Sequence, residues 1–189
     1  MGGPADREQL AVVKRAQQTS PPDRIEQAKR DADESVDTMF AAVLGKPLPA
    51  AALPATTHLF QRLEETGDVV IGPAKVAFKR VRPYLSDPEI KALVRPSTSG
   101  SYPSGHTTHI TASAIIMADL VPEKRDAIWA RAQDYAWSRV IGGMHYPNDL
   151  DGGKLAGTAI AVAIRNRPEF KADFDAAKRE LRQYLGLSP

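Results

Sequence analysis

The sequence predicts an all-α protein, a single-domain helical bundle. Four stretches with a helical pattern follow one another after residue 105, separated only by short breaks at prolines and glycines. The one β-type run, Val69-Val70-Ile71, is three residues long and is followed directly by Gly72-Pro73. A chain of 189 residues is long enough for one sizeable core, so we expect one domain.

The first half of the chain divides at its prolines and glycines. Residues 1–22 form a polar N-terminal segment, and we expect the helical domain to occupy residues 23–189. Apolar residues near helical spacing predict a first helix over 24–44. A second helix is expected over 57–66, with Gly67 as its stop signal.

The second half contains a long loop and most of the helices. A helix is expected over 74–81, and it ends before Pro83. Residues 84–104 are rich in Pro, Ser, Thr and Gly, and we expect the loop 84–101 and Tyr102 to form the rim of a pocket. The remaining helices are expected at about 105–120, 122–140, 149–165 and 168–185.

Composition excludes several classes of protein. Lys and Arg number 25 against 23 Asp and Glu, so the net charge of +2 gives no reason to expect nucleic-acid binding. There is no cysteine, which excludes disulfides, thiolate catalysis and Cys-based zinc sites. The most apolar stretches fall short of the roughly 20 residues that cross a bilayer, so we expect a soluble chain with no transmembrane segment. The N-terminus lacks the apolar core of a signal peptide, which leaves open whether one was removed.

Three segments concentrate polar side chains at expected helix ends. In the first, Lys75 and Arg82 are two helical turns apart, so on one helix they would share a face and could grip one anion. In the second, Ser104, Gly105 and His106 lead into a long helix. The first amides of such a helix have no partner within it and attract anions. Either segment alone is more often an ordinary surface pair or a Ser N-cap.

The third segment holds Arg139, His145 and Asp149. A carboxylate four residues after a histidine can accept its ring N–H and raise the basicity of the other nitrogen. The plainer interpretation is that Asp149 caps a helix and His145 is a loop residue.

Taken together, the three segments bring three positive charges, several neutral donors and two histidines. That inventory suits a phosphate or a phosphoryl-transfer transition state.

The three segments resemble the signature of a known family. Lys75-x6-Arg82-Pro83, Pro103-Ser104-Gly105-His106 and Ser138-Arg139-x5-His145-x3-Asp149 are similar to the three-part signature of the type 2 phosphatidic acid phosphatase superfamily. Within it, the chain most resembles the soluble class A bacterial non-specific acid phosphatases, whose relatives include the vanadium haloperoxidases. The resemblance implies a helical bundle of the acid phosphatase/vanadium haloperoxidase type.

The resemblance also implies roles for these residues in a metal-independent phosphomonoester hydrolase. His145 would attack phosphorus and form a phosphohistidine, and Asp149 would orient it. His106 would act as general acid and then as general base. The phosphoryl oxygens would be held by Lys75, Arg82, Ser104, Gly105 and Arg139.

We expect no required cofactor and no metal site, and we expect vanadate to bind as a mimic of the transition state. A metal pair of His106 and His109 lacks a convincing carboxylate to complete it. The expected partner is a phosphorylated small molecule, and a homo-oligomer is left open. By resemblance the location would be periplasmic or secreted, with the cytoplasm not excluded.

Other functions remain open at this point. One is a lipid phosphate or prenyl diphosphate phosphatase that acts on monomeric or surface-presented lipid. A vanadium-dependent haloperoxidase would use the same pocket for different chemistry, although the chain is short for that class. A non-catalytic phosphate-binding module would need neither histidine.

Overall fold

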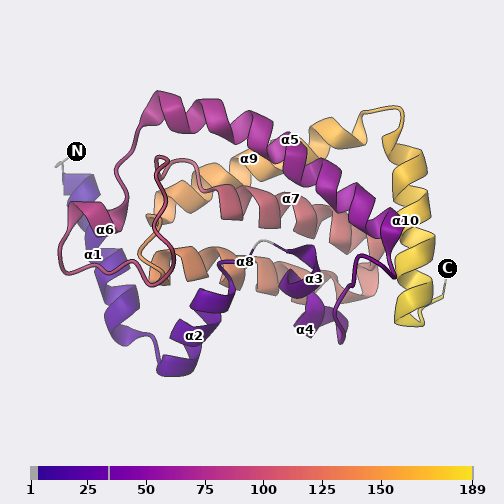
Figure 1. Cartoon of the computed structure of the whole chain (residues 1–189), viewed down its shortest axis with the longest axis horizontal. Helices are drawn as coiled ribbons and strands as arrows, with labels where there is room; N and C mark the ends of the chain where they lie inside the picture. Colours follow the sequence, from indigo (N-terminus) through magenta and orange to yellow (C-terminus); the bar gives the residue numbers. More distant parts are fainter. Residues whose placement is uncertain (1–3, 34, 189) are drawn as a thin grey trace.

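Helix α7 (Gly105–Leu120) is the central element of the computed structural model, which describes residues 4–33 and 35–188. Most of its side chains are buried, as is expected for a helix that is covered on all sides. The all-α prediction is confirmed, and the described residues contain no strand. The long helices that pack against α7 are α5 (Pro54–Phe78), α8 (Arg125–Ile141), α9 (Pro147–Arg165) and α10 (Phe170–Leu185) (Figure 1).

Shorter elements cover the two ends of this bundle. Helices α1 (Pro4–Thr19) and α2 (Pro22–Arg30) pack against α8, on the left in Figure 1. Helix α10 stands across the opposite end, where the C-terminus lies. The remaining short helices are α3 (Val36–Met39), α4 (Ala41–Leu44), α6 (Pro83–Ser86) and the 3-10 turn η1 (Pro122–Lys124).

Helix α1 covers most of the predicted polar segment 1–22. It packs against α8 and α9, and its Val13 is completely buried in an apolar cluster with Val140 and Tyr146. The described part of this segment therefore lies against the same body as the helices that follow. Residues 1–3, and 189 at the other end, lie outside the described residues.

The prediction of one helix over 24–44 is wrong. Helix α2 ends at Arg30, and the chain then turns inward, where Asp31 is buried with its carboxylate bonded to Arg131 and Ser138. These partners satisfy the Asp31 carboxylate in the interior, so the turn replaces a continuous helix. Helical structure returns only in the short α3 and α4.

The prediction that a helix stops at Gly67 is also wrong. Helix α5 runs for 25 residues through Gly67, Val69-Val70-Ile71 and Pro73. Pro73 removes one backbone donor, which leaves the Val69 carbonyl without its helical partner. The Val69 side chain is 75% exposed, so this part of the helix faces water, which can satisfy that carbonyl. Packing of α5 against α7, α9 and α10 sustains the helix in place of local propensity.

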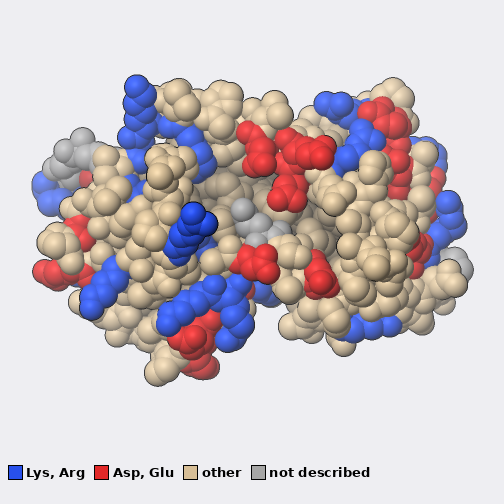
Figure 2. Space-filling view, in the orientation of Figure 1, with Lys and Arg blue, Asp and Glu red and all other residues tan. Residues whose placement is uncertain are grey.

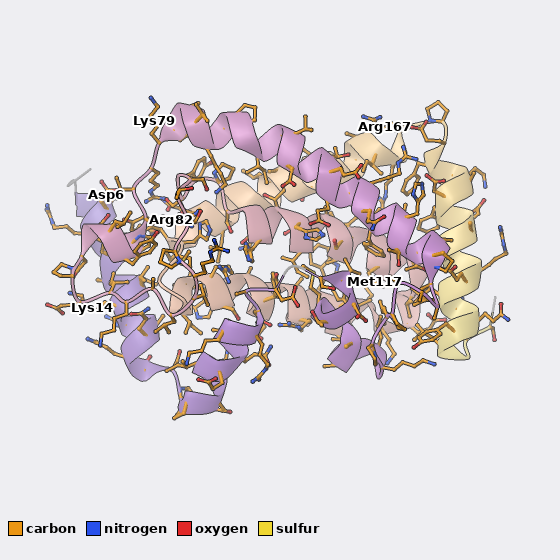
Figure 3. The ribbon with its side chains drawn as sticks, viewed as in Figure 1. Asp6, Lys14, Lys79, Arg82, Met117 and Arg167 are labelled. Carbon is orange, nitrogen blue, oxygen red and sulfur yellow. The ribbon has the colours of Figure 1, made fainter. Side chains whose placement is uncertain are left out.

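Helix α5 ends at Phe78, so Lys75 and Arg82 do not share the face of one helix as expected. Lys79 adopts a left-handed conformation with φ 47°, and the chain leaves the helix axis there. Figure 3 shows Lys79 pointing away from the bundle and Arg82 among the inner side chains beyond the helix end.

The four helices expected after residue 105 are confirmed with small shifts in their bounds. In the part of the chain that the structure describes, no helix combines the length and the apolar composition that a bilayer crossing requires.

Two glycines of α9 allow it to lie directly on α7. A Cβ at Gly153 would lie 2.8 Å from the Ser104 carbonyl oxygen. A Cβ at Gly157 would collide with the Thr108 carbonyl oxygen and lie 2.8 Å from the Thr111 Cβ. Because backbone atoms cannot move aside cheaply, both positions require glycine.

We predict that Gly157→Ala lowers the free energy of unfolding by about 3 kcal/mol, since the added methyl group forces α9 away from α7. Urea unfolding measures the change. Gly67→Ala is the matched control, because the new Cβ would meet its nearest neighbour, Ile160 Cδ1, at 4.0 Å. That variant should be unchanged or more stable by up to about 1 kcal/mol. Equal unfolding midpoints for the two variants would contradict the prediction.

Candidate active site

A cavity of about 530 Å³ opens beside α5 and α7, with the ends of α8 and the long loop completing its wall. Six of the eight site residues that the sequence predicts line it, and they come from all three sequence segments. They are Lys75, Arg82, Gly105, His106, Arg139 and His145. The fold therefore brings the three sequence segments to one place.

Lys75 and Arg82 converge on one carbonyl group of the long loop. The Lys75 Nζ donates to the Gly100 oxygen at 2.9 Å, and Arg82 Nη2 donates to the same oxygen at 3.3 Å. Arg82 is 4% exposed and also donates from Nε to Ser99 O at 2.9 Å. The loop, rather than a helix face, is what places these two cations side by side.

The contact between Arg82 and His145 fixes the tautomer of the histidine. Arg82 Nη1 lies 3.2 Å from His145 Nε2, and a guanidinium can only donate hydrogen bonds. His145 Nε2 must therefore be the acceptor, so in the neutral ring the proton is on Nδ1. Nδ1 lies 3.5 Å from the Asp149 Oδ2, so its N–H faces the negative carboxylate. Nε2 is left as the basic nitrogen, in the wall of the cavity.

Asp149 is completely buried behind His145 and does not line the cavity. Its Oδ2 accepts the backbone N–H of Tyr146 at 2.8 Å, so it caps α9 as well as facing the histidine. Burial alone would raise the pKa of Asp149, but His145, the Tyr146 amide and Arg80 together hold it below its usual value. Asp149 is therefore an anion at neutral pH.

Arg80 is a site residue that the sequence analysis missed. Its Nη1 donates to Asp149 Oδ1 at 2.5 Å, and its guanidinium lies 4.0 Å from the centre of the Tyr146 ring. The buried carboxylate thus has a cationic partner on the side away from His145. The sequence shows Arg80 only as one of several basic residues after α5, and nothing in that pattern distinguishes it.

His106 is bonded to the chain that follows α2. Its Nε2 lies 3.3 Å from the Ala32 oxygen, which can only accept, so Nε2 carries a proton. Burial lowers the pKa of His106 well below its usual value, and the nearby charges of Arg139 and His145 lower it further.

A buried network around Asp31 supports both Arg139 and His106. The Asp31 carboxylate accepts from Arg131 Nη2 at 2.6 Å and from Ser138 Oγ at 2.6 Å. The Asp31 backbone oxygen accepts from Arg139 Nη1 at 3.4 Å, next to the Ala32 carbonyl that holds His106. The sequence analysis missed Asp31 because its partners lie about a hundred residues further along the chain.

Ser104 is the N-cap of α7 and is buried below the cavity rather than in its wall. Its Oγ accepts the Thr107 amide at 3.2 Å and the Thr107 hydroxyl at 2.9 Å. Gly105 does line the cavity, and a Cβ there would meet nothing within 4 Å. The space at Gly105 is thus open to a ligand that approaches the first turn of α7.

The expected rim is correct for the loop and wrong for Tyr102. Val94, Arg95, Ser97 and Ser99 of the loop line the cavity. The Tyr102 ring instead packs against α9 at Gly152 and edge-on against Phe78, at 4.7 Å between ring centres. Among the described residues, no group of three or more His, Asp or Glu side chains is placed to hold a metal ion.

Two buried histidines make stability depend on pH. Burial lowers the pKa of His145 and of His109 to about 4, from a usual value of 6.5. The folded state therefore binds these protons less tightly than the unfolded state, and stability falls as the pH drops from 6.5 towards 4. Each histidine can cost up to about 3 kcal/mol over that window.

We predict that the free energy of unfolding without ligand is several kcal/mol smaller at pH 4.5 than at pH 7, as measured by urea unfolding. His109→Leu should reduce this difference by about 2 kcal/mol, because one of the titrating groups is removed. Asp149 does not contribute between pH 7 and pH 4.5. Folding lowers its pKa, so the stability that its charged form provides is lost only as the pH falls below the usual pKa of an aspartate. An unchanged pH slope in the variant would refute this assignment.

Comparisons with known proteins identify a family to which the chain is similar. Residues 51–172 match the sequence model of the PAP2 superfamily. A non-specific acid phosphatase of Providencia stuartii is 32% identical over 166 residues, which are 84% of this chain and 67% of the relative. An acid phosphatase of Zymomonas mobilis is 32% identical over 161 residues, 82% of this chain and 61% of the relative. The chain thus spans about two thirds of the length of these relatives.

A solved structure shares the fold. The transmembrane PAP2-type phosphatidylglycerolphosphate phosphatase of Bacillus subtilis superposes with a TM-score of 0.65 over 87% of this chain and 86% of its own. The sequence identity is 18%, so this likeness concerns the arrangement of the helices.

Proposed function

The chain belongs to the PAP2 superfamily, and from that premise we propose that it is a phosphomonoester hydrolase of the acid phosphatase type, with His145 as the nucleophile. The observation that carries the proposal is the pair of contacts that hold the His145 ring. Asp149 faces Nδ1 and keeps the lone pair on Nε2, which Arg82 contacts in the empty site and would release on binding the phosphoryl group.

The cations of the cavity would bind the phosphoryl group of the substrate. Lys75, Arg82 and Arg139 supply three positive charges, and the open first turn of α7 at Gly105 supplies backbone amides. Ser104 would contribute by capping that turn, since its Oγ accepts the Thr107 amide. Charge of this kind stabilises the equatorial oxygens of the transition state more than it stabilises the ester itself.

The reaction would proceed in two steps. His145 Nε2 attacks phosphorus, the P–O bond to the alcohol breaks, and His106 gives its proton to the leaving oxygen. Water then attacks the phosphohistidine as His106 takes one proton from it, which releases phosphate and restores Nε2. A bound phosphoryl dianion favours the charged form of His106, so the lowered pKa of the empty site does not prevent the first step.

Rapid mixing with 4-nitrophenyl phosphate tests the proposal. We expect a burst of nitrophenol equal to the enzyme concentration and a protein-bound phosphate that is labile in acid and stable in base. Chelator should not change the rate, and vanadate should inhibit by occupying the phosphoryl site. Turnover without any bound phosphate intermediate would overturn the role of His145.

A lipid phosphatase is the second candidate. The cavity wall includes Leu63, Ile71 and Ile160, which could contact an acyl chain, and the fold neighbour is named for a lipid phosphate. Hydrolysis of short-chain phosphatidic acid below its micelle concentration, compared with a soluble ester of similar leaving-group acidity, separates the two. A kcat/KM at least about tenfold higher for the lipid would favour this candidate.

A periplasmic or secreted location remains a prediction, and fractionation of cells tests it.

A further inference from the structure

The cavity has a second end that the phosphoryl group would not fill. Along α5, which forms one wall, Leu63 lies twelve residues before Lys75, or about 18 Å along the helix axis. A phosphoryl group held by Lys75 therefore leaves this end for the alcohol part of the ester. The residues that line it are Leu63, Glu64, Gly67, Asp68, His109, Ala112 and Ile160.

His109 is a polar group in this wall without a bonding partner. It is 8% exposed, and its Nε2 makes no hydrogen bond to any described residue. A buried nitrogen of this kind is costly unless something that enters the cavity bonds to it. Burial lowers its pKa to about 4, so at neutral pH the ring is uncharged. His109 lies one turn of α7 beyond His106, in the same cavity wall.

Two carboxylates stand beside it on α5. Glu64 and Asp68 are four residues apart, so they lie on one face of the helix, and both line the cavity. Burial and the negative charges of Asp68 and Glu65 raise the pKa of Glu64. Figure 2 shows acidic side chains gathered over α5 at the border of the hollow, with Lys and Arg concentrated towards the other side.

The two ends of the cavity therefore differ in charge. The end near Lys75 and Arg82 is cationic, and the other end combines two carboxylates with an uncharged imidazole over an apolar floor. A second phosphate or a carboxylate on the alcohol would meet like charge there. A primary ammonium group has three donors and one positive charge, which matches Asp68, Glu64 and the unbonded Nε2 of His109.

We propose that Glu64, Asp68 and His109 form a leaving-group subsite, and that it selects phosphomonoesters of alcohols that carry a protonated amine on a short apolar body. This inference rests on the proposed function, because it names the substrate class of that same cavity. The apolar body would contact Ile71 and Ile160, and the ammonium group would reach the carboxylates.

Three aryl phosphates test the proposal. They are the 4-(aminomethyl), 4-ethyl and 4-(carboxymethyl) phenyl phosphates, whose charges are separated from the reacting oxygen by the ring. We expect kcat/KM to decrease in that order, with at least about a tenfold ratio between the ammonium and the carboxylate ester. Asp68→Asn should reduce this ratio about fivefold, and adding Glu64→Gln should bring it close to one.

Matched variants separate this effect from a change in overall charge. Asp126→Asn removes one carboxylate from the exposed start of α8, outside the cavity, and it should leave the ratio unchanged. His109→Leu removes the open nitrogen and should lower the rate of the ammonium ester relative to the ethyl ester by about fivefold. Glu64 and Asp68 are exposed, so their neutral variants should fold.

Calorimetry with the three corresponding arylphosphonates tests the subsite without turnover. Tighter binding of the ammonium compound, lost in Asp68→Asn, supports the proposal even if no ester is hydrolysed, in which case only the proposed function fails. Equal affinities of the three phosphonates, or a ratio of rates that Asp68→Asn and Asp126→Asn change alike, would overturn it.

Discussion

Replacing His145 with alanine is expected to lower kcat for a phosphomonoester by about 10⁴-fold or more. The proposed nucleophile is the imidazole Nε2, which lies beside Arg82 in the wall of the cavity, and alanine offers no such group. Losses of this size are typical when the attacking group of a covalent mechanism is removed. Steady-state kinetics with 4-nitrophenyl phosphate gives the value, and the protein-bound phosphate should disappear with it.

The fold of this variant should survive, because His145 is an uncharged side chain and Asp149 keeps its partner Arg80. Circular dichroism and a thermal melt check this point. Vanadate or phosphate should still bind, since the cations that hold them are intact. His58→Ala is the matched control, because this histidine is exposed on α5 and does not line the cavity. Residual turnover within tenfold of the parent would rule out His145 as the nucleophile.

The sequence was sufficient to predict the helices after residue 105 and the three segments that meet in the cavity. In those helices the breaks at Pro122, Pro147 and the glycines near residue 142 are strong local signals. The polar segments could be found because each places several chemically related side chains at a helix end. Local patterns of this kind survive folding, since the end of a helix is where side chains and backbone amides are both available.

Helix α5 was not predicted because its local signals favour a break. Gly67, the β-branched run and Pro73 each weaken a helix, yet the helix continues, because its packing against α7, α9 and α10 stabilises it.

Arg80 and Asp31, which contact the predicted site residues, were not predicted for a different reason. Arg80 and Asp31 act on Asp149 and Arg139 through contacts across about 70 and 110 positions of chain. Such pairings appear only once the chain is folded.

The second large effect is expected at Asp149, whose carboxylate acts together with Arg82 to keep the proton of His145 on Nδ1. With Asp149 ionised, the Nδ1–H form is favoured and the lone pair that would attack stays on Nε2. In Asp149→Asn the amide is neutral, and with its oxygen on Arg80 the NH₂ group faces the ring. An amide N–H opposes a proton on Nδ1 and Arg82 opposes one on Nε2, so neither neutral tautomer keeps the orientation that attack needs.

We predict that Asp149→Asn lowers kcat about 10³- to 10⁴-fold with little change in the affinity for phosphate, because tautomer and orientation are lost while the anion-binding cations remain. Product release from single turnovers, together with calorimetry of phosphate binding, separates the two quantities. Asn148→Asp provides a matched control on the adjacent residue, since Asn148 also contacts Arg80 but does not face His145. If kcat fell equally in both variants, the cause would be the loss of Arg80 geometry rather than the tautomer of His145.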